Sequence, residues 1–350
     1  MLPTRHAKVT SKYTNMSSKP YLFPVTSLPG HGTITLSLLP PSTPTLETLS
    51  YQYPLKLVAP APLTSEDDSL VHTVFLLTYG GGLVAGDTIN LTVNMARKSK
   101  LVLLTQGSTK IFKTVDPGVV SRQSMNVKLD GGSALCYLPD PVQPFEGSAF
   151  EQRQVYDLLE RSGSEAVEQA SLCVCDWVSE GRTARGERWR IWRYGSRNEV
   201  WQVGEEGKRR LLLRDNVVFE DGNKADMLPD FQGRVDGLGV FGTLIIKGPV
   251  FEGLGKFFLS EFAKLPRIGA RKWGDEEKEE ENEVELWRKT RQKDETRDGL
   301  IWTAANVRGF VLVKFGAKEV EGGKRWLSTM LKTENSVERN FGERALHCLK

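Results

Sequence analysis

The stretch INLTVNMARKSKLVLLT, residues 89–105, decides the fold class. Both of its ends carry the apolar and β-branched pattern of strands that bury one face. Segments of the same kind lie at 33–39, 119–129, 134–138, 150–158, 170–178, 187–194, 199–203, 209–218 and 240–246. Many short strands with almost no helix between them argue against βαβ repeats and favour a sandwich, a barrel or a solenoid of sheets.

Helical patterns are confined to the last third of the chain. Apolar residues follow helical spacing at 252–265, where Pro266 ends the segment, and again at 319–332. Between them, residues 275–297 are acidic and then of mixed charge, which predicts an exposed polar insertion able to form one isolated helix. We therefore expect a disordered basic tail at 1–20 and a single domain at 21–350, with a polar insertion at about 270–298.

Composition excludes several classes of protein. The chain has 350 residues, 39% of them hydrophobic, a mean hydropathy of −0.34 and a net charge of +3. No segment approaches the roughly 20 apolar residues of a membrane helix, and the first 20 residues lack the apolar core of a secretory signal. The charge is too balanced to predict nucleic-acid binding. We expect a cytoplasmic protein that binds neither nucleic acid nor membrane.

Cysteine and histidine usage argues against disulfides and against a tight metal site. The four cysteines form no CxxC pair, and the four histidines are dispersed. On a strand, Cys173 and Cys175 share one face, where a buried apolar pair is the usual outcome. The sequence contains no nucleophile elbow, no HExxH motif and no Walker motif, and so nothing indicates an enzyme.

Two glycine- and hydroxyl-rich segments follow predicted strands. TYGGGLVAGD, residues 78–87, is not followed by a helix N-terminus, so a backbone role is favoured over phosphate binding, and Asp87 is expected to hold its own turn. LVLLTQGSTKIFK, residues 101–113, places Thr105, Ser108 and Thr109 at a strand–turn–strand junction. These hydroxyls suit either a polar hairpin turn or the lining of a channel, and the spacing does not decide between them.

Two further segments carry carboxylates. In ALCYLPDPVQPFEG, residues 134–147, Asp140 lies between prolines that fix an extended backbone, and is expected to be exposed or capping. In EGRTARGE, residues 180–187, Glu187 follows Arg182 by five positions. The pair is either a weak surface ion pair or a buried carboxylate that an arginine keeps ionised and available to a passing cation.

Taken together, the ordered segments GGGLVAGD, LLTQGSTKIFK, LPDPVQPFEGSAFEQ and EGRTARGE resemble the signature of the UreD family of urease accessory proteins, also called UreH, in a fungal-type member. The resemblance is firm over residues 69–192 and weaker on both sides. It implies a mainly β, solenoid-like fold of stacked sheets with a few helices. The polar insertion lies outside the family pattern, and we draw no function from it.

The resemblance also implies a function. UreD-like proteins bind UreF, which recruits the nickel-carrying GTPase UreG, and the assembly supports nickel insertion into apo-urease. Nickel would then be in transit, with no cofactor tightly bound. Family models route it through a tunnel, and the matching positions here are Asp87 and Glu187. We expect these carboxylates on the path, with Thr105, Ser108, Thr109 and Asp140 as polar lining. Sparse oxygen ligands would bind the ion weakly enough to release it.

Two rival functions make different demands on the structure. A carbohydrate-binding module needs a row of exposed aromatic side chains, for which Trp189, Trp192 and Trp201 are the candidates. A hydrolase needs two close carboxylates with separated pKa values in a cleft.

Overall fold

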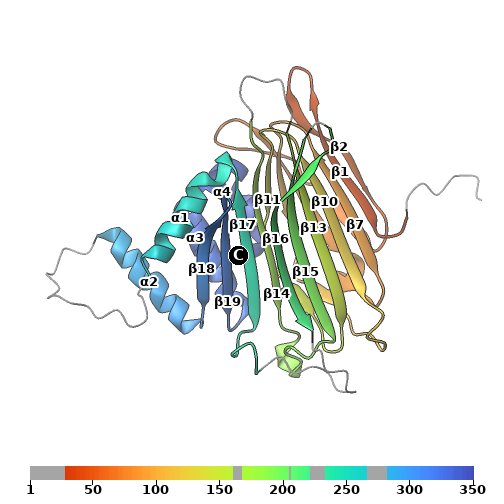
Figure 1. Cartoon of the computed structure of the whole chain (residues 1–350), viewed down its shortest axis with the longest axis vertical. Coiled ribbons are helices and arrows are strands. Elements are labelled where there is room, and N and C mark those ends of the chain that lie inside the picture. The colour runs from red at the N-terminus through yellow and green to blue at the C-terminus, as the bar shows by residue number, and fades with distance from the viewer. Residues whose placement is uncertain (1–27, 161–167, 205, 221–232, 266–281) are drawn as a thin grey trace, which may run out of the picture.

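Two stacked β-sheets and a layer of helices make up the computed structural model, which describes residues 28–160, 168–204, 206–220, 233–265 and 282–350 (Figure 1). The first sheet has seven strands, in the spatial order β16 (Arg209–Glu220), β15 (Arg193–Val203), β13 (Ala149–Leu159), β10 (Ser121–Leu129), β7 (Thr88–Met95), β1 (His31–Leu39) and β2 (Thr43–Tyr51).

The second sheet is longer but partly interrupted. Its main path runs β18 (Ile301–Val307), β19 (Phe310–Ala317), β17 (Val240–Lys247), β14 (Ser171–Ser179), β11 (Ala134–Tyr137), β8 (Lys100–Leu104), β5 (Leu70–Thr78) and β3 (Leu55–Val58). Four short strands lie off this path: β4 (Leu63–Thr64), β6 (Gly82–Leu83), β9 (Thr109–Ile111) and β12 (Val142–Pro144).

The chain passes back and forth between the sheets. From β7 to β15 the long strands alternate between the first and second sheet, and neighbours within each sheet are parallel over this region. Parallel neighbours need a crossover connection. Here the crossover is a strand of the other sheet, which explains why the sequence needs almost no helix between these strands.

Two hydrophobic cores hold the layers together. One fills the space between the sheets and includes Leu91, Leu103 and Trp189. The other lies between the second sheet and the helices, and includes Cys173 and Trp326. The helical layer comprises α1 (Glu252–Ala263), α2 (Glu283–Arg297), α3 (Val320–Glu334) and α4 (Ser336–Phe341), together with the 3-10 turns η3 (Pro249–Phe251) and η4 (Glu343–Leu349). Two further 3-10 turns, η1 (Tyr79–Gly81) and η2 (Thr183–Arg185), lie in loops that connect strands.

The expected fold class, mainly β with stacked sheets and a few C-terminal helices, is confirmed. The helices predicted at 252–265 and 319–332 form as α1 and α3. The predicted strand at 187–194 is wrong, because β15 begins only at Arg193. Gly186, at φ +71°, ends η2, and a tight loop follows in place of a strand. Strands β18 and β19, which follow the charged segment, are not predicted by the sequence patterns.

The polar insertion contributes a helix that is not isolated. Arg288 of α2 forms an ion pair with Glu261 of α1 at 2.9 Å, and the buried Arg291 contacts Glu295 at 2.7 Å. Glu295 accepts hydrogen bonds from the indole N–H groups of Trp302 and Trp326. Charged contacts therefore attach α2 to the helical layer.

The predicted basic tail and residues 270–281 of the predicted insertion lie outside the described residues. Among the helices that are described, none is both long and apolar enough to cross a membrane.

Candidate functional site

Three of the four ordered motifs interrupt the second sheet at one level. Strand β5 gives way to β6 across residues 79–81, β8 to β9 across 105–108, and β11 to β12 across 138–141. Because β5, β8 and β11 are neighbours, and β6, β9 and β12 pair again beyond the break, the three loops lie side by side. Strand β14 runs past the break without interruption. The motifs thus form a gap in an otherwise regular sheet.

Local sequence explains the break. Gly80, Gly81 and Gly107 adopt φ values of +75°, +74° and +83°, which other residues rarely reach. Gly82 has an extended backbone, but an added Cβ would lie 2.3 Å from the carbonyl oxygen of Lys110 on β9. Glycines here both turn the chain and permit close approach of the strands that resume beyond the gap.

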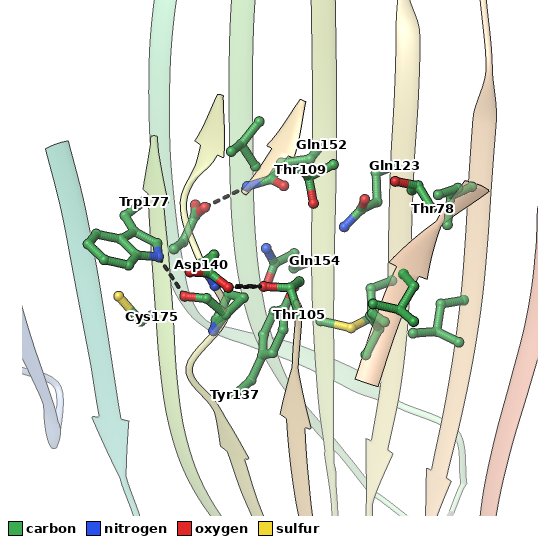
Figure 2. Close-up of a pocket in the computed structure, with 18 of the residues that line it drawn as sticks. Thr78, Thr105, Thr109, Gln123, Tyr137, Asp140, Gln152, Gln154, Cys175 and Trp177 are labelled. Carbon is green, nitrogen blue, oxygen red and sulfur yellow. Dashed lines mark hydrogen bonds between the residues drawn. The ribbon is translucent and has the colours of Figure 1, made fainter. Parts of the chain in front are cut away.

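A small polar cavity between the sheets borders the break (Figure 2). Water molecules could occupy about 30 Å³ inside it, which is enough for one or two of them. Its walls are apolar at Leu55, Leu91 and Met125. Its polar lining comes from both sheets: Thr78, Thr105, Thr109, Gln123, Asp140, Gln152, Gln154 and Asp176.

Asp176 is one of two buried carboxylates that line this cavity, the other being Asp140. Asp176 lies on the inter-sheet side of β14 with 6% of its surface exposed. It accepts hydrogen bonds from Gln152 Nε2 at 2.5 Å, from Asn198 Nδ2 at 2.5 Å and from the Ser196 hydroxyl. All three donors are neutral. The Asn198 side-chain oxygen is buried without a hydrogen-bond partner among the described residues.

The environment of Asp176 disfavours its charge. Burial raises its pKa, the three hydrogen bonds offset part of that effect, and nearby Asp215 raises it further. A carboxylate held this way, surrounded by neutral amide and hydroxyl oxygens, would gain stability from a cation. These are oxygen ligands of the kind that hard divalent ions accept.

Asp140 lies at the break itself, where it is buried and not exposed. Its Oδ2 accepts hydrogen bonds from the Thr105 hydroxyl at 3.0 Å and the Gly107 amide at 2.9 Å, and its Oδ1 contacts Lys324 Nζ at 2.9 Å. Trp177 Nε1 donates to the Pro139 carbonyl at 2.8 Å and so fixes the loop. Figure 2 shows Asp140 and Thr105 facing each other, joined by their hydrogen bond.

Of the other residues that the sequence proposes for the nickel path, some line the cavity and others do not. Thr105 and Thr109 line the cavity together with Asp140, whereas Ser108 is half-buried and does not line it. Asp87 is half-buried and holds its own turn, since its Oδ2 accepts from the Val84 amide at 3.0 Å. It is not among the residues that line the cavity.

Glu187 is buried, with 4% of its surface exposed, and it also lies outside the cavity lining. It accepts from Arg182 Nε at 2.7 Å and from the backbone amides of Arg182 and Glu146. Burial pushes its pKa upward, but these hydrogen bonds outweigh burial and hold the pKa below its usual value. It is a buried carboxylate kept ionised by an arginine.

Sequence patterns do not predict three polar residues of the cavity lining: Asp176, Gln152 and Gln154. Each occupies an inward position on a strand whose other inward residues are mainly apolar. That polar interruption is the signal that could have identified them, because such a position otherwise costs stability.

The cysteines are not placed as metal ligands. All four are buried and reduced, and Cys136, Cys173 and Cys175 pack in the helix-side core. Cys175 also borders the cavity, but burial and the neighbouring Asp176 raise the pKa of its thiol. Within the described ranges no three His, Cys, Asp or Glu residues gather closely enough to hold a metal ion.

Comparison with known proteins supports the family resemblance of the motifs. The family model described as UreD urease accessory protein matches residues 30–346. A protein of Cryptococcus neoformans var. grubii named urease accessory protein 4 is 30% identical over 342 residues, covering 90% of this chain and 93% of its own. A Schizosaccharomyces pombe protein described as ureD-like is 30% identical over 284 residues, covering 79% and 84%.

Similarity extends to bacteria. The UreD protein of Sorangium cellulosum is 37% identical over 204 residues, or 58% of this chain and 57% of its own. The family match spans both sheets, the break and most of the helical layer. The chain belongs to the UreD family of urease accessory proteins.

Proposed function

We propose that this protein conducts nickel ions through the polar space between its sheets, from a UreF-like and UreG-like complex toward apo-urease in the cytoplasm. The observation that carries the proposal is Asp176, a buried carboxylate with only neutral hydrogen-bond donors, in a water-sized cavity beside the motif-built break. Three motifs that are separate in the sequence meet beside this cavity in the fold.

The chemistry of the lining suits an ion that must leave again. Carboxylate, amide and hydroxyl oxygens bind Ni²⁺ less tightly than thiolate or imidazole would. A cavity with room for one or two water molecules cannot hold a divalent cation together with a full shell of six waters. The ion must therefore exchange some of its water for oxygens of the wall, or the walls must part while it passes.

The motif carboxylates outside the cavity keep a secondary place in this proposal. Glu187 stays ionised beside the loop that carries Glu146, and Asp87 holds the turn that leads into β7. The negative charge of Asp87 would favour a cation near the protein, and that of Glu187, which Arg182 partly compensates, would add less. The cavity lining would then receive the cation.

The rival functions find less support in the geometry. Trp189 is buried against Phe219 and Phe241. Trp192 and Trp201 are half-buried and Arg209 stacks over Trp201, so the candidate tryptophans form no exposed row. Asp176 and Asp215 are two nearby carboxylates, but the space beside Asp176 holds only a water or two. A hydrolase substrate would not fit there. We propose a role without catalysis.

The test replaces the charge and keeps the shape. Asp176→Asn is co-expressed with urease and the other accessory proteins, and the nickel content of purified urease is measured by mass spectrometry. We expect nickel loading to fall at least about tenfold, the loss that follows from about 1.4 kcal/mol of lost ion stabilisation. Asp157→Asn is the matched control, because the half-buried Asp157 pairs with Arg209 and lies outside the cavity lining. Full loading of urease with the Asp176→Asn protein would refute the route.

A further inference from the structure

A lysine from the helical layer reaches the break in the second sheet. Lys324 belongs to α3, yet its Nζ lies 2.9 Å from Asp140 Oδ1. The Asp140 side chain is 6% exposed and that of Lys324 is 17% exposed. The cavity lining comes from strands and their connecting loops, whereas this ammonium comes from outside the two-sheet body.

The contact leaves Asp140 fully engaged. Oδ1 faces Lys324, and Oδ2 accepts from Thr105 and Gly107. A divalent cation that approached Oδ1 would meet an ammonium at hydrogen-bonding distance from the same oxygen, and the two positive charges would repel each other. The cation can bind Asp140 only if Lys324 leaves.

We propose that Lys324 is a displaceable counter-ion that controls access of a divalent cation to Asp140. The inference rests on the proposed nickel route and adds to it a second carboxylate with its own regulator. Lysine suits the role, since its ammonium is a compact point charge on a flexible stem and is not held by the rigid, forked contacts of an arginine. Its residual exposure gives the ammonium a way to water.

At Asp140 a metal ion replaces the Lys324 ammonium, and the replacement is reversible. When the cation arrives, the ammonium withdraws into water as the cation takes its oxygen, and the reverse exchange releases the cation. The free energy of the Lys324–Asp140 pair is subtracted from the affinity of the cation. A buried carboxylate is thus kept compensated when no ion is present, and the ion is bound weakly when it is.

The experiment measures Ni²⁺ binding to the purified full chain by isothermal titration calorimetry. Lys324→Met removes the charge and keeps most of the stem, and we expect it to tighten Ni²⁺ binding about tenfold. Lys324→Arg keeps the positive charge, and we expect it to bind Ni²⁺ no tighter than the unaltered protein does. Lys332→Met, an exposed lysine on the same helix, is the control and should change nothing.

A double variant separates an effect on Ni²⁺ binding from an effect on folding. Lys324→Met leaves Asp140 without its partner, so the double variant Asp140→Asn/Lys324→Met is measured beside it, with circular dichroism on both. We expect the double variant to fold and to lose the tenfold gain. A folded Lys324→Met protein with unchanged Ni²⁺ affinity would overturn the inference, as would a gain that survives in the double variant.

The two proposals fail differently. If Asp176→Asn abolishes nickel loading of urease while Lys324→Met leaves Ni²⁺ affinity unchanged, only the counter-ion inference is wrong. If Asp176→Asn loads urease normally while Lys324→Met still tightens binding through Asp140, the route through the cavity is wrong and the counter-ion remains supported.

Discussion

Asp176 shows how a single buried charge links function to stability. Its hydrogen bonds come from neutral groups, and burial raises its pKa above the ordinary value. A raised pKa means that the folded protein holds the proton more tightly than the unfolded chain does. Its contribution to the free energy of unfolding is therefore largest below the unfolded pKa of about 3.9 and falls as the pH rises through the folded value.

We predict that Asp176→Asn stabilises the protein at pH 8 and has a smaller effect at pH 5. Each unit by which the pKa is raised corresponds to about 1.4 kcal/mol of stabilisation lost at high pH, which the neutral amide recovers. Asn198 can flip its amide to accept from the new side chain, because its oxygen has no partner among the described residues. Urea unfolding at the two pH values measures the effect.

Asp157→Asn serves as the control for this prediction, since Asp157 is a half-buried carboxylate outside the cavity lining and pairs with the exposed Arg209. It should change stability by less than about 1 kcal/mol at both pH values. A folded Asp176→Asn protein that is less stable than the unaltered chain at pH 8 would contradict the expected cost of the buried charge. A gain in stability together with a loss of nickel delivery would show that function maintains this residue at the expense of stability.

At the scale of elements, the break in the second sheet depends on backbone contacts. Gly82 begins β6, and a Cβ there would approach the Lys110 carbonyl on β9 to 2.3 Å. Gly82→Ala must therefore push β6 and β9 apart. We expect a loss of about 1–3 kcal/mol in the free energy of unfolding, measured by urea denaturation.

Gly233→Ala is the matched control, because its Cβ would meet no atom of the described residues within 4 Å and its φ is not in the left-handed region. It should be neutral or slightly stabilising. If both alanine variants unfold at the same urea concentration, the close approach of β6 to β9 contributes nothing to stability.

At the scale of the whole molecule, the second sheet belongs to both hydrophobic cores. One of its faces packs on the first sheet and the other on the helices, so loss of either core exposes the strands of the other. We predict one cooperative unfolding transition, in which far-ultraviolet circular dichroism and tryptophan fluorescence give the same midpoint.

The tryptophans allow each core to be followed separately. Trp189 lies between the sheets, and Trp326 lies between the second sheet and the helices. Removing either signal with Trp189→Phe or Trp326→Phe should leave the fluorescence and circular dichroism midpoints coincident within each variant. Two separated transitions would show that the helical layer unfolds independently of the two-sheet body.

Sequence patterns determined much of this protein without any coordinates. Alternating and β-branched segments predicted most of the long strands, and helical spacing predicted α1 and α3, because a single buried face imposes a short-range period. The ordered motifs identified the family. Strand prediction failed at residues 187–194, where Gly186 and the contacts of Glu187 build a loop from residues that could equally form a strand.

Only the tertiary structure decided where the motifs meet and which polar groups share one space. Thr105 and Asp140 are 35 positions apart, yet they share a hydrogen bond, and Lys324 reaches Asp140 from 184 positions away. Asp176 and its donors come from three strands of two different sheets. Local periodicity reports which face of a strand is buried, but the partners of a buried charge are set by long-range packing, which brings together side chains that no spacing along the chain relates.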